Sequence, residues 1–135
     1  NKTKKKFYVF NAHYDHQGVV ARKESSKLIL SRIKEMAGKD PVILTGDFNG
    51  DHDSEWYQAL AYSNLLKDTY RQVEHPYAPN SSFNDWGRAN HRDEIIDHIF
   101  TTEHFLVQRW GLLTDTYHGK YPSDHFPVLV SLKWK

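Results

Sequence analysis

A strand–helix–strand pattern near the start of the chain restricts its fold more than any other feature. Residues 7–12 are almost continuously apolar, which is typical of a buried strand. Residues 21–37 have the helical period, and one stripe carries Ser26, Ile29, Ile33, Met36 and Ala37, broadened by Leu30. Gly38 and Pro41 end this helix, and residues 42–45 form a second apolar run. The pattern predicts a parallel crossover unit and therefore an α/β fold.

The rest of the chain adds a short helix and further strands. A helix is expected from a cap at Asp53 or Ser54 to about Tyr62, with Trp56 and Leu60 facing inward. Residues 65–70 are ambiguous and fit a short strand, whereas 74–92 and 112–121 have the composition of loops. Strands are predicted at 95–100, 105–110 and 126–134. The last of these alternates, with one face formed by Val128, Val130, Leu132 and Trp134.

Composition limits the class of protein. The 135 residues suit one domain, residues 1–135. The net charge of +1 lacks the cationic surplus that is typical of nonspecific nucleic-acid binding. The chain has no Cys, which excludes disulfides and thiolate metal sites. No segment of the sequence is apolar enough for a membrane span, and the composition is compatible with cytoplasm or export.

Polar residues gather where the predicted strands end. Asp47 and Asn49 follow a buried strand, and alternation would point both to one side with Phe48 on the other. The carboxyl ends of strands are where open α/β sheets bind ligands. A carboxylate beside a carboxamide offers a metal ligand and a donor to phosphate, but the same residues also suit a simple turn.

Three more clusters occupy similar positions: residues 13–16, Asp97-His98 and Asp124-His125. His13 fits a phosphate site or a buried His bonded to the backbone. His16 and His98 are interpreted as structural or surface residues. Because neighbouring strand residues face opposite ways, Asp97 and His98 need not form a pair. The recurrence of acidic and imidazole groups without Cys favours a hard cation such as Mg²⁺.

Four ordered motifs resemble those of the endonuclease/exonuclease/phosphatase superfamily, which includes DNase I-like nucleases, deadenylases, inositol-phosphate phosphatases and sphingomyelinases. They are Asn-Ala-His-Tyr-Asp at 11–15, Gly-Asp-Phe-Asn at 46–49, Ile-Asp-His-Ile-Phe at 96–100 and Ser-Asp-His-Phe-Pro-Val at 123–128. The likeness is closer to bacterial-type members whose first motif continues to an Ala-Arg pair, here Ala21-Arg22. Some relatives of that kind act on sugar phosphates.

The resemblance implies half of a four-layered α/β sandwich, with mixed β-sheets face to face and helices outside. It also implies hydrolysis of a phosphoester with Mg²⁺ or Mn²⁺. In this scheme Asp97 orients His125, which acts as general base or stabilises the transition state. The other implied roles are a phosphate hydrogen bond from His13, water orientation or metal binding by Asp47, phosphate or metal binding by Asn49, and metal binding by Asp124.

The resemblance places substrate contacts on Arg22 and on the loop that carries Phe83, Asn84 and Trp86. Phe83 or Trp86 fits stacking on a base or sugar ring, and equally fits packing of a long loop. The substrate, whether nucleic acid, sugar phosphate or another phosphoester, stays open. The modest net charge weakens the interpretation as a nonspecific duplex nuclease, because such proteins usually present a cationic face to phosphates.

The chain departs from the family pattern in length. The family fold is longer, and its first half supplies an early Asn and the principal metal-binding Glu. The chain is therefore expected to be the C-terminal half of a domain, partnered by an N-terminal half. The alternative is a catalytically incomplete half-domain that serves as a binding or structural unit. Another sheet is expected to cover Phe7, Val9, Val42, Leu44, Ile99 and Val130.

Overall fold

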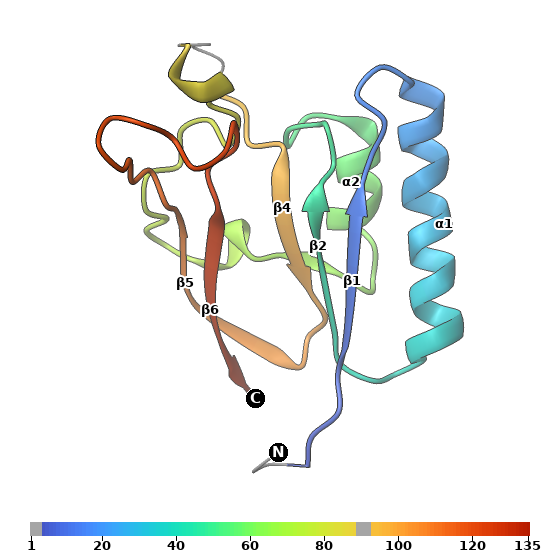
Figure 1. The fold of residues 1–135 in the computed structure, drawn as a ribbon. Coiled ribbons are helices and arrows are strands. Elements are labelled where there is room, and N and C mark those ends of the chain that lie inside the picture. Colours follow the sequence, from blue (N-terminus) through green and yellow to red (C-terminus); the bar gives the residue numbers. More distant parts are fainter. Residues whose placement is uncertain (1–3, 89–92) are drawn as a thin grey trace.

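The crossover unit forms as expected. The computed structural model describes residues 4–88 and 93–135. Strand β1 (Tyr8–His13) leads to helix α1 (Val19–Ala37) and then to strand β2 (Val42–Asp47). β1 and β2 pair in parallel, with Tyr8 opposite Val42 and His13 opposite Asp47. Both strands therefore end at the same edge of the sheet (Figure 1).

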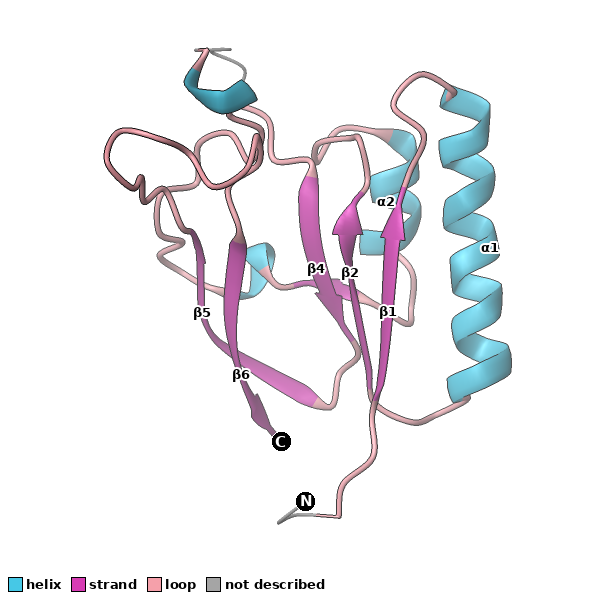
Figure 2. Ribbon diagram, viewed as in Figure 1, coloured by secondary structure: helices cyan, strands magenta, loops and turns pink. Residues whose placement is uncertain are grey.

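The remaining elements complete one mixed sheet and one antiparallel pair (Figure 2). Helix α2 (Glu55–Ala61) is followed by the short strand β3 (Lys67–Asp68) and by β4 (Asp97–Thr101). The four-stranded sheet has the order β1-β2-β4-β3, with β4 antiparallel to both neighbours. β5 (Phe105–Leu112) and β6 (Val128–Trp134) form the second sheet. Single 3₁₀ turns occupy Tyr70–Gln72 and Asp85–Gly87.

The elements are layered. Figure 1 shows α1 and α2 on one side of the four-stranded sheet and β5 and β6 on the other. The main core lies between the helices and the sheet, where Ile33 of α1 and Leu60 of α2 are fully buried with Leu44 of β2. A second core lies around Ile95, Trp110 and Leu112. The predicted fold class, α/β with mixed sheets and outer helices, is thus confirmed.

Two predictions about facing were wrong. Val42 and Leu44 were expected to face another sheet, but both lie in the core beneath the helices, because even-numbered positions of β2 point that way. Met36 was expected on the buried stripe of α1, but 57% of it is exposed. Because each residue of an α-helix is rotated by about 100° from the one before, Met36 lies outside the buried stripe that contains Ile33 and Ala37.

Several predicted boundaries shift. Phe7 lies before β1 and packs its ring edge against Phe105 and Trp134 of the second sheet. Helix α1 begins two positions earlier than predicted, at Val19. Ser54 takes the cap position of α2, but its hydroxyl donates to the Asp51 carbonyl and accepts no backbone N–H of the helix. The predicted loop at 74–92 includes residues 89–92, which lie outside the described residues.

The alternation of β6 is as predicted. Val128, Val130, Leu132 and Trp134 are each more buried than the residues between them. Within the described residues, no helix has the length and apolar character needed to cross a membrane.

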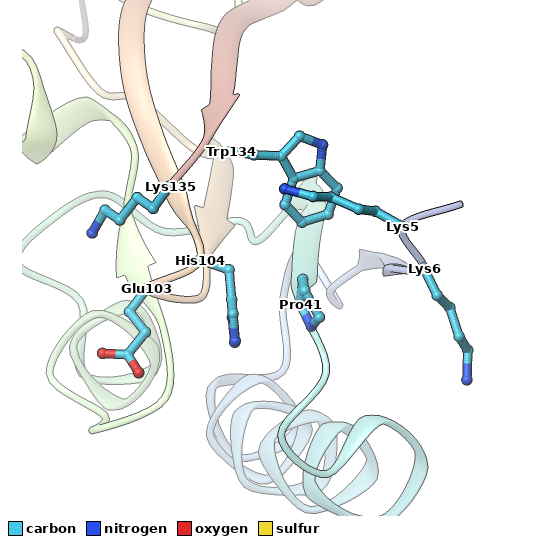
Figure 3. A pocket seen from close by; sticks show the side chains of 7 residues that line it. All are labelled: Lys5, Lys6, Pro41, Glu103, His104, Trp134 and Lys135. Atoms are coloured by element: carbon cyan, nitrogen blue, oxygen red, sulfur yellow. The ribbon is translucent and has the colours of Figure 1, made fainter. Parts of the chain in front are cut away.

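A pocket lies at the end of the strands opposite to the polar clusters (Figure 3). Its walls are Lys5, Lys6, Pro41, Glu103, His104, Trp134 and Lys135. The Lys5 ammonium lies 4.9 Å from the centroid of the Trp134 ring. Pro41 precedes β2, whereas Asp47 ends it, so the length of that strand separates this pocket from the polar clusters.

Ser26 joins three elements in the main core and provides a test of the packing. It is fully buried, and its hydroxyl donates to the carbonyl of Trp56 at 2.8 Å and contacts the Tyr14 hydroxyl at 3.1 Å. Ser26→Ala should lower the free energy of unfolding of the intact protein by about 1–3 kcal/mol, because both partners stay buried. Urea denaturation measures the effect. Ser31→Ala, on the exposed side of the same helix, is the control and should change stability by less than about 0.5 kcal/mol.

Candidate active site

Strand pairing brings three predicted site residues to one edge of the four-stranded sheet. His13 is opposite Asp47 in the parallel pair, and Asp97 is opposite Asp47 in the antiparallel pair. The Nε2 atom of His13 lies 3.4 Å from an Asp47 carboxylate oxygen. Residues far apart in the sequence therefore meet through backbone register alone.

His125 joins this group from the loop before β6. Its Nδ1 lies 2.8 Å from Oδ2 of Asp97, within hydrogen-bond distance. Its Nε2 lies 4.0 Å from Oδ2 of Asp47. Because Nδ1 donates to the carboxylate, neutral His125 has its lone pair on Nε2. The pairing of Asp97 with His125 is the one that the motifs predicted.

Ser82 fixes the relative position of these two residues, although only its neighbours Phe83, Asn84 and Trp86 were predicted to have a role. The buried Ser82 hydroxyl accepts the backbone N–H groups of Ile96 and Asp97, at 2.9 and 3.2 Å. The Ser82 carbonyl accepts the N–H of Phe126 at 2.7 Å. One residue thereby ties the start of β4 to the segment that carries His125. Only the long-range pairing reveals this role.

A tight turn positions Asn49. Its backbone N–H donates to Oδ1 of Asp47 at 2.8 Å, and its φ of 47° lies in the left-handed region that Asn tolerates. Its side-chain Nδ2 donates to the carbonyl of Tyr14 at 2.9 Å. Phe48 between them is fully buried, so the predicted alternation is present. The pairing of β1 with β2 just before this turn requires Gly46, since a Cβ there would lie 1.9 Å from the Ala12 carbonyl oxygen.

These residues open onto a cleft of about 650 Å³. Its walls are His13, His16, Arg22, Asp47, Asn49, Gly50, Ser81, Phe83, Glu94, Ile96 and His125. Six of the predicted site residues are among them. Asp97 is not, but it is hydrogen-bonded to His125, which lines the cleft. Ser81 and Glu94 were not predicted, because nothing in their local sequence distinguishes them from ordinary loop residues.

Two predicted substrate contacts lie in the cleft wall. Arg22 is 8% exposed, stacks its guanidinium 4.3 Å from the centroid of the Trp56 ring, and donates to the Asp15 carbonyl at 2.8 Å. The Phe83 ring packs edge-on against His125, with centroids 5.1 Å apart. Phe83 thus packs against the imidazole of the site, and its role in stacking on a substrate stays a prediction.

Besides Asp97, three predicted residues do not line the cleft. Asp124 accepts a hydrogen bond from the Ser123 hydroxyl at 3.3 Å. The side-chain Nδ2 of Asn84 donates to the Ser123 carbonyl at 3.1 Å, which is a structural use of the amide. Trp86 is 54% exposed. Metal binding by Asp124 and substrate binding by Asn84 and Trp86 therefore stay predictions.

Burial and neighbouring charges raise two pKa values in the site. Burial is the main cause that raises the pKa of Asp47, and the nearby Asp97 carboxylate adds to it. The hydrogen bond to Asp97 is the main cause that raises the pKa of His125, with Asp47 and Asp124 contributing. The carboxylates contribute to both shifts, and a cation bound there would offset that part of them.

The donor atoms are close enough to share one ion. Oxygen atoms of Asp47 and Asp97 and a ring nitrogen of His125 all lie within 4.8 Å of one another. Asn49 adds a carboxamide oxygen, because its amide nitrogen is the atom directed at Tyr14. Two carboxylates and a carboxamide are oxygen donors of the kind that Mg²⁺ and Mn²⁺ favour. The site therefore has oxygen donors that can bind a hard cation and an imidazole, that of His125, that can transfer a proton.

Comparison with known proteins relates this arrangement to one family. The sequence model of the Endonuclease/Exonuclease/phosphatase family matches residues 4–125. An uncharacterized protein of Acanthamoeba polyphaga mimivirus is 31% identical over 136 residues, which cover 93% of this chain and 49% of that protein.

Solved structures share the fold. The mannosyl-6-phosphatase of Bacteroides thetaiotaomicron VPI-5482 matches with a TM-score of 0.91 and 40% identity, over 98% of this chain and 53% of that one. The catalytic domain of human nocturnin, with bound sulfate, matches with a TM-score of 0.77 and 23% identity, over 99% and 49% of the two chains. The latter shows likeness of fold alone. This chain spans about half the length of the relatives it matches.

The pairing of His125 with Asp97 predicts a pH effect. Asp97→Asn should lower the pKa of His125 toward its ordinary value of about 6.5, because the carboxylate favours the protonated imidazole. Wild-type protein should lose the stability due to this pair as the pH rises through the raised pKa of folded His125, and the variant should lack that dependence. NMR titration of the imidazole measures the shift. The exposed Asp53, changed to Asn, is the control, and an unchanged His125 pKa in Asp97→Asn would contradict the assignment.

Proposed function

This chain belongs to the Endonuclease/Exonuclease/phosphatase family, and from that premise we propose that its cleft is part of the catalytic centre of a metal-dependent phosphoester hydrolase. One observation carries the proposal. His125, held by Asp97 at 2.8 Å, meets Asp47 at the edge of a cleft that His13 and Asn49 also line. A carboxylate-oriented imidazole beside further acidic groups is an arrangement suited to acid–base chemistry on a bound phosphate.

His125 handles the proton in this scheme. Neutral His125 accepts a proton from the attacking water at Nε2, and Asp97 stabilises the imidazolium that forms. The protonated ring would instead donate from Nε2 to a phosphoryl oxygen. The pH–rate profile distinguishes these two roles, because the first requires the neutral ring and the second the protonated one.

The other cleft residues bind the phosphate or the metal and orient the attacking water. His13 donates to a phosphate oxygen from the cleft wall, where its Nε2 lies 3.4 Å from an Asp47 carboxylate oxygen. Asp47 orients the attacking water or takes part in metal binding. The second amide hydrogen of Asn49 is available for a phosphate oxygen, since Nδ2 has two hydrogens and Tyr14 accepts one.

The donor set fits Mg²⁺ or Mn²⁺. Asp47 and the carboxamide oxygen of Asn49 would hold the ion, and Asp124 is the further ligand that the family motif implies. The closeness of the Asp47 and Asp97 oxygens supports this assignment, because a bound cation would offset the charge of the two carboxylates. A bound ion would polarise the phosphoryl oxygen and offset the charge that develops on it.

The substrate class that we propose is a sugar phosphate. The 40% identical mannosyl-6-phosphatase supports this, as does the net charge of +1, which is low for binding a polyanion. Glu94 in the cleft wall would repel additional phosphates, whereas its carboxylate can accept hydrogen bonds from sugar hydroxyls. Nuclease activity is the alternative, and Phe83 would then stack on a base.

The whole protein's activity also depends on a segment outside this chain. Because the matched structures are about twice as long, we include in the proposal an N-terminal half that completes the metal site. A half-domain that acts only as a binding or structural unit is the rival function, and the assays below distinguish the two.

His125→Ala in the intact protein should lower kcat by about 10²–10⁴-fold, because proton transfer at Nε2 is lost. The measurement is phosphate release from mannose 6-phosphate, compared with cleavage of a single-stranded oligonucleotide. The exposed His75→Ala is the matched control and should keep wild-type kcat. A wild-type rate in a folded His125→Ala protein would remove this residue from the mechanism. No turnover of either substrate by the intact wild-type protein would favour the binding unit.

Metal removal provides an independent test. Dialysis against a chelator should abolish phosphate release, and Mg²⁺ or Mn²⁺ should restore it, because Asp47 and its neighbours hold the ion through oxygen atoms. The metal content is measured by mass spectrometry before each assay. Full turnover by protein shown to be metal-free would refute the cofactor assignment. Full turnover by the 135-residue chain alone would refute the need for a second half.

A further inference from the structure

A second cluster of ligating side chains lies on the opposite face of the sheet from the cleft. Its members are His52 from the loop before α2, Asp68 from β3 and His98 from β4. Oδ2 of Asp68 lies 3.6 Å from Nε2 of His52 and 3.7 Å from Nδ1 of His98. Asp68 and His98 are each only 2% exposed. The cluster is thus a buried meeting point of three elements.

Each imidazole has one nitrogen already engaged. Nε2 of His98 lies 2.9 Å from the Gly50 carbonyl, which can only accept, so this nitrogen carries the proton. Nδ1 of His52 contacts the Asp51 carboxylate in the same way. The lone pairs of the neutral rings are therefore on the other two nitrogens, Nε2 of His52 and Nδ1 of His98. Both of these atoms are buried without a hydrogen-bond partner.

The carboxylate is oriented as well. Oδ1 of Asp68 accepts the backbone N–H of Tyr70 at 3.0 Å, and Oδ2 accepts the Tyr57 hydroxyl at 2.6 Å. Oδ2 keeps a second lone pair, and it is the oxygen that faces both free imidazole nitrogens.

The spacing suits a shared ion better than hydrogen bonds. Separations of 3.6 and 3.7 Å are longer than a nitrogen–oxygen hydrogen bond. Two ligands that each lie about 2.0–2.1 Å from a tetrahedral zinc ion are roughly 3.3 Å apart. A small contraction would bring Oδ2 of Asp68 to that distance from both nitrogens, and the ligand atoms of the three residues all lie within 4.8 Å of one another. Imidazoles held by a carboxylate and by a backbone carbonyl are also the usual surroundings of metal-binding histidines.

We propose that His52, Asp68 and His98 form a zinc site with three protein ligands. Two neutral imidazole nitrogens and one carboxylate oxygen are zinc ligands, and softer thiolates are absent from the chain. The rings of Tyr57, Tyr70 and Phe100 surround the histidines and screen the site from solvent. The partial exposure of His52 provides a route by which the ion enters.

This site is distinct from the proposed phosphoester site but lies behind it. Asp97 and His98 are neighbours on β4, and their side chains point to opposite faces of the sheet. Gly50, whose carbonyl holds His98, directly follows Asn49 in the cleft wall. A zinc ion would therefore fasten the loop that carries Asn49 to β3 and β4.

The test uses the intact protein, loaded with Zn²⁺ after chelation and desalting. Mass spectrometry should find one equivalent of zinc more in the wild type than in His52→Ala or His98→Gln. Replacement by Co²⁺ should give the visible absorption bands of a low-coordinate site, and these bands should be absent from both variants. His75→Ala is the matched control and should keep this equivalent of zinc, because His75 is exposed and does not belong to the cluster.

A milder variant tests the contact between the Asp51 carboxylate and the zinc ligand His52. Asp51→Asn should weaken zinc binding about 10- to 100-fold, because Nδ1 of His52 loses its carboxylate partner.

Circular dichroism confirms that each variant is folded, and the melting temperature of the wild type should rise with added Zn²⁺. The proposal is overturned if folded His52→Ala binds as much zinc as the wild type. It is also overturned if micromolar Zn²⁺ neither binds to the wild type nor shifts its melting temperature.

Discussion

The parallel pairing of β1 with β2 is the constraint on which the rest of the structure depends. Because α1 crosses from the end of one strand to the start of the next, both strands run in the same direction and end together. Their register sets His13 opposite Asp47, and the antiparallel β4 adds Asp97 beside them. A shift of one residue in either pairing would turn these side chains to the helix side of the sheet.

Alternation along the strands separates two kinds of chemistry. One face of the sheet edge carries Asp47 and Asp97 toward an open cleft, where water and a charged substrate have access. The other face carries Phe48 and His98 into a closed aromatic core. The same backbone segments thereby support a solvated acidic site and a dry imidazole cluster, separated only by the thickness of the sheet.

Excess negative charge defines the electrostatics of the cleft. Asp47 and Asp97 lie beside His125. Burial is the main cause that raises the pKa of Asp47, and the hydrogen bond to Asp97 is the main cause that raises the pKa of His125. The fold holds these charges close because backbone hydrogen bonds fix the residues, as in the turn at Asn49. Such a site stabilises whatever positive charge it receives, whether a proton on His125 or a bound cation.

The sequence by itself determined the crossover unit, the strand-end position of each polar cluster and the pairing of Asp97 with His125, since local periodicity and ordered motifs carry that information. The tertiary structure alone decided which face of β2 is covered by helices, because both faces of that strand have similar residues. It also brought Asp68 to His98 across β3 and β4, although nothing in the local sequence of Asp68 predicts this contact. Local patterns specify elements, but only long-range register specifies which side chains meet.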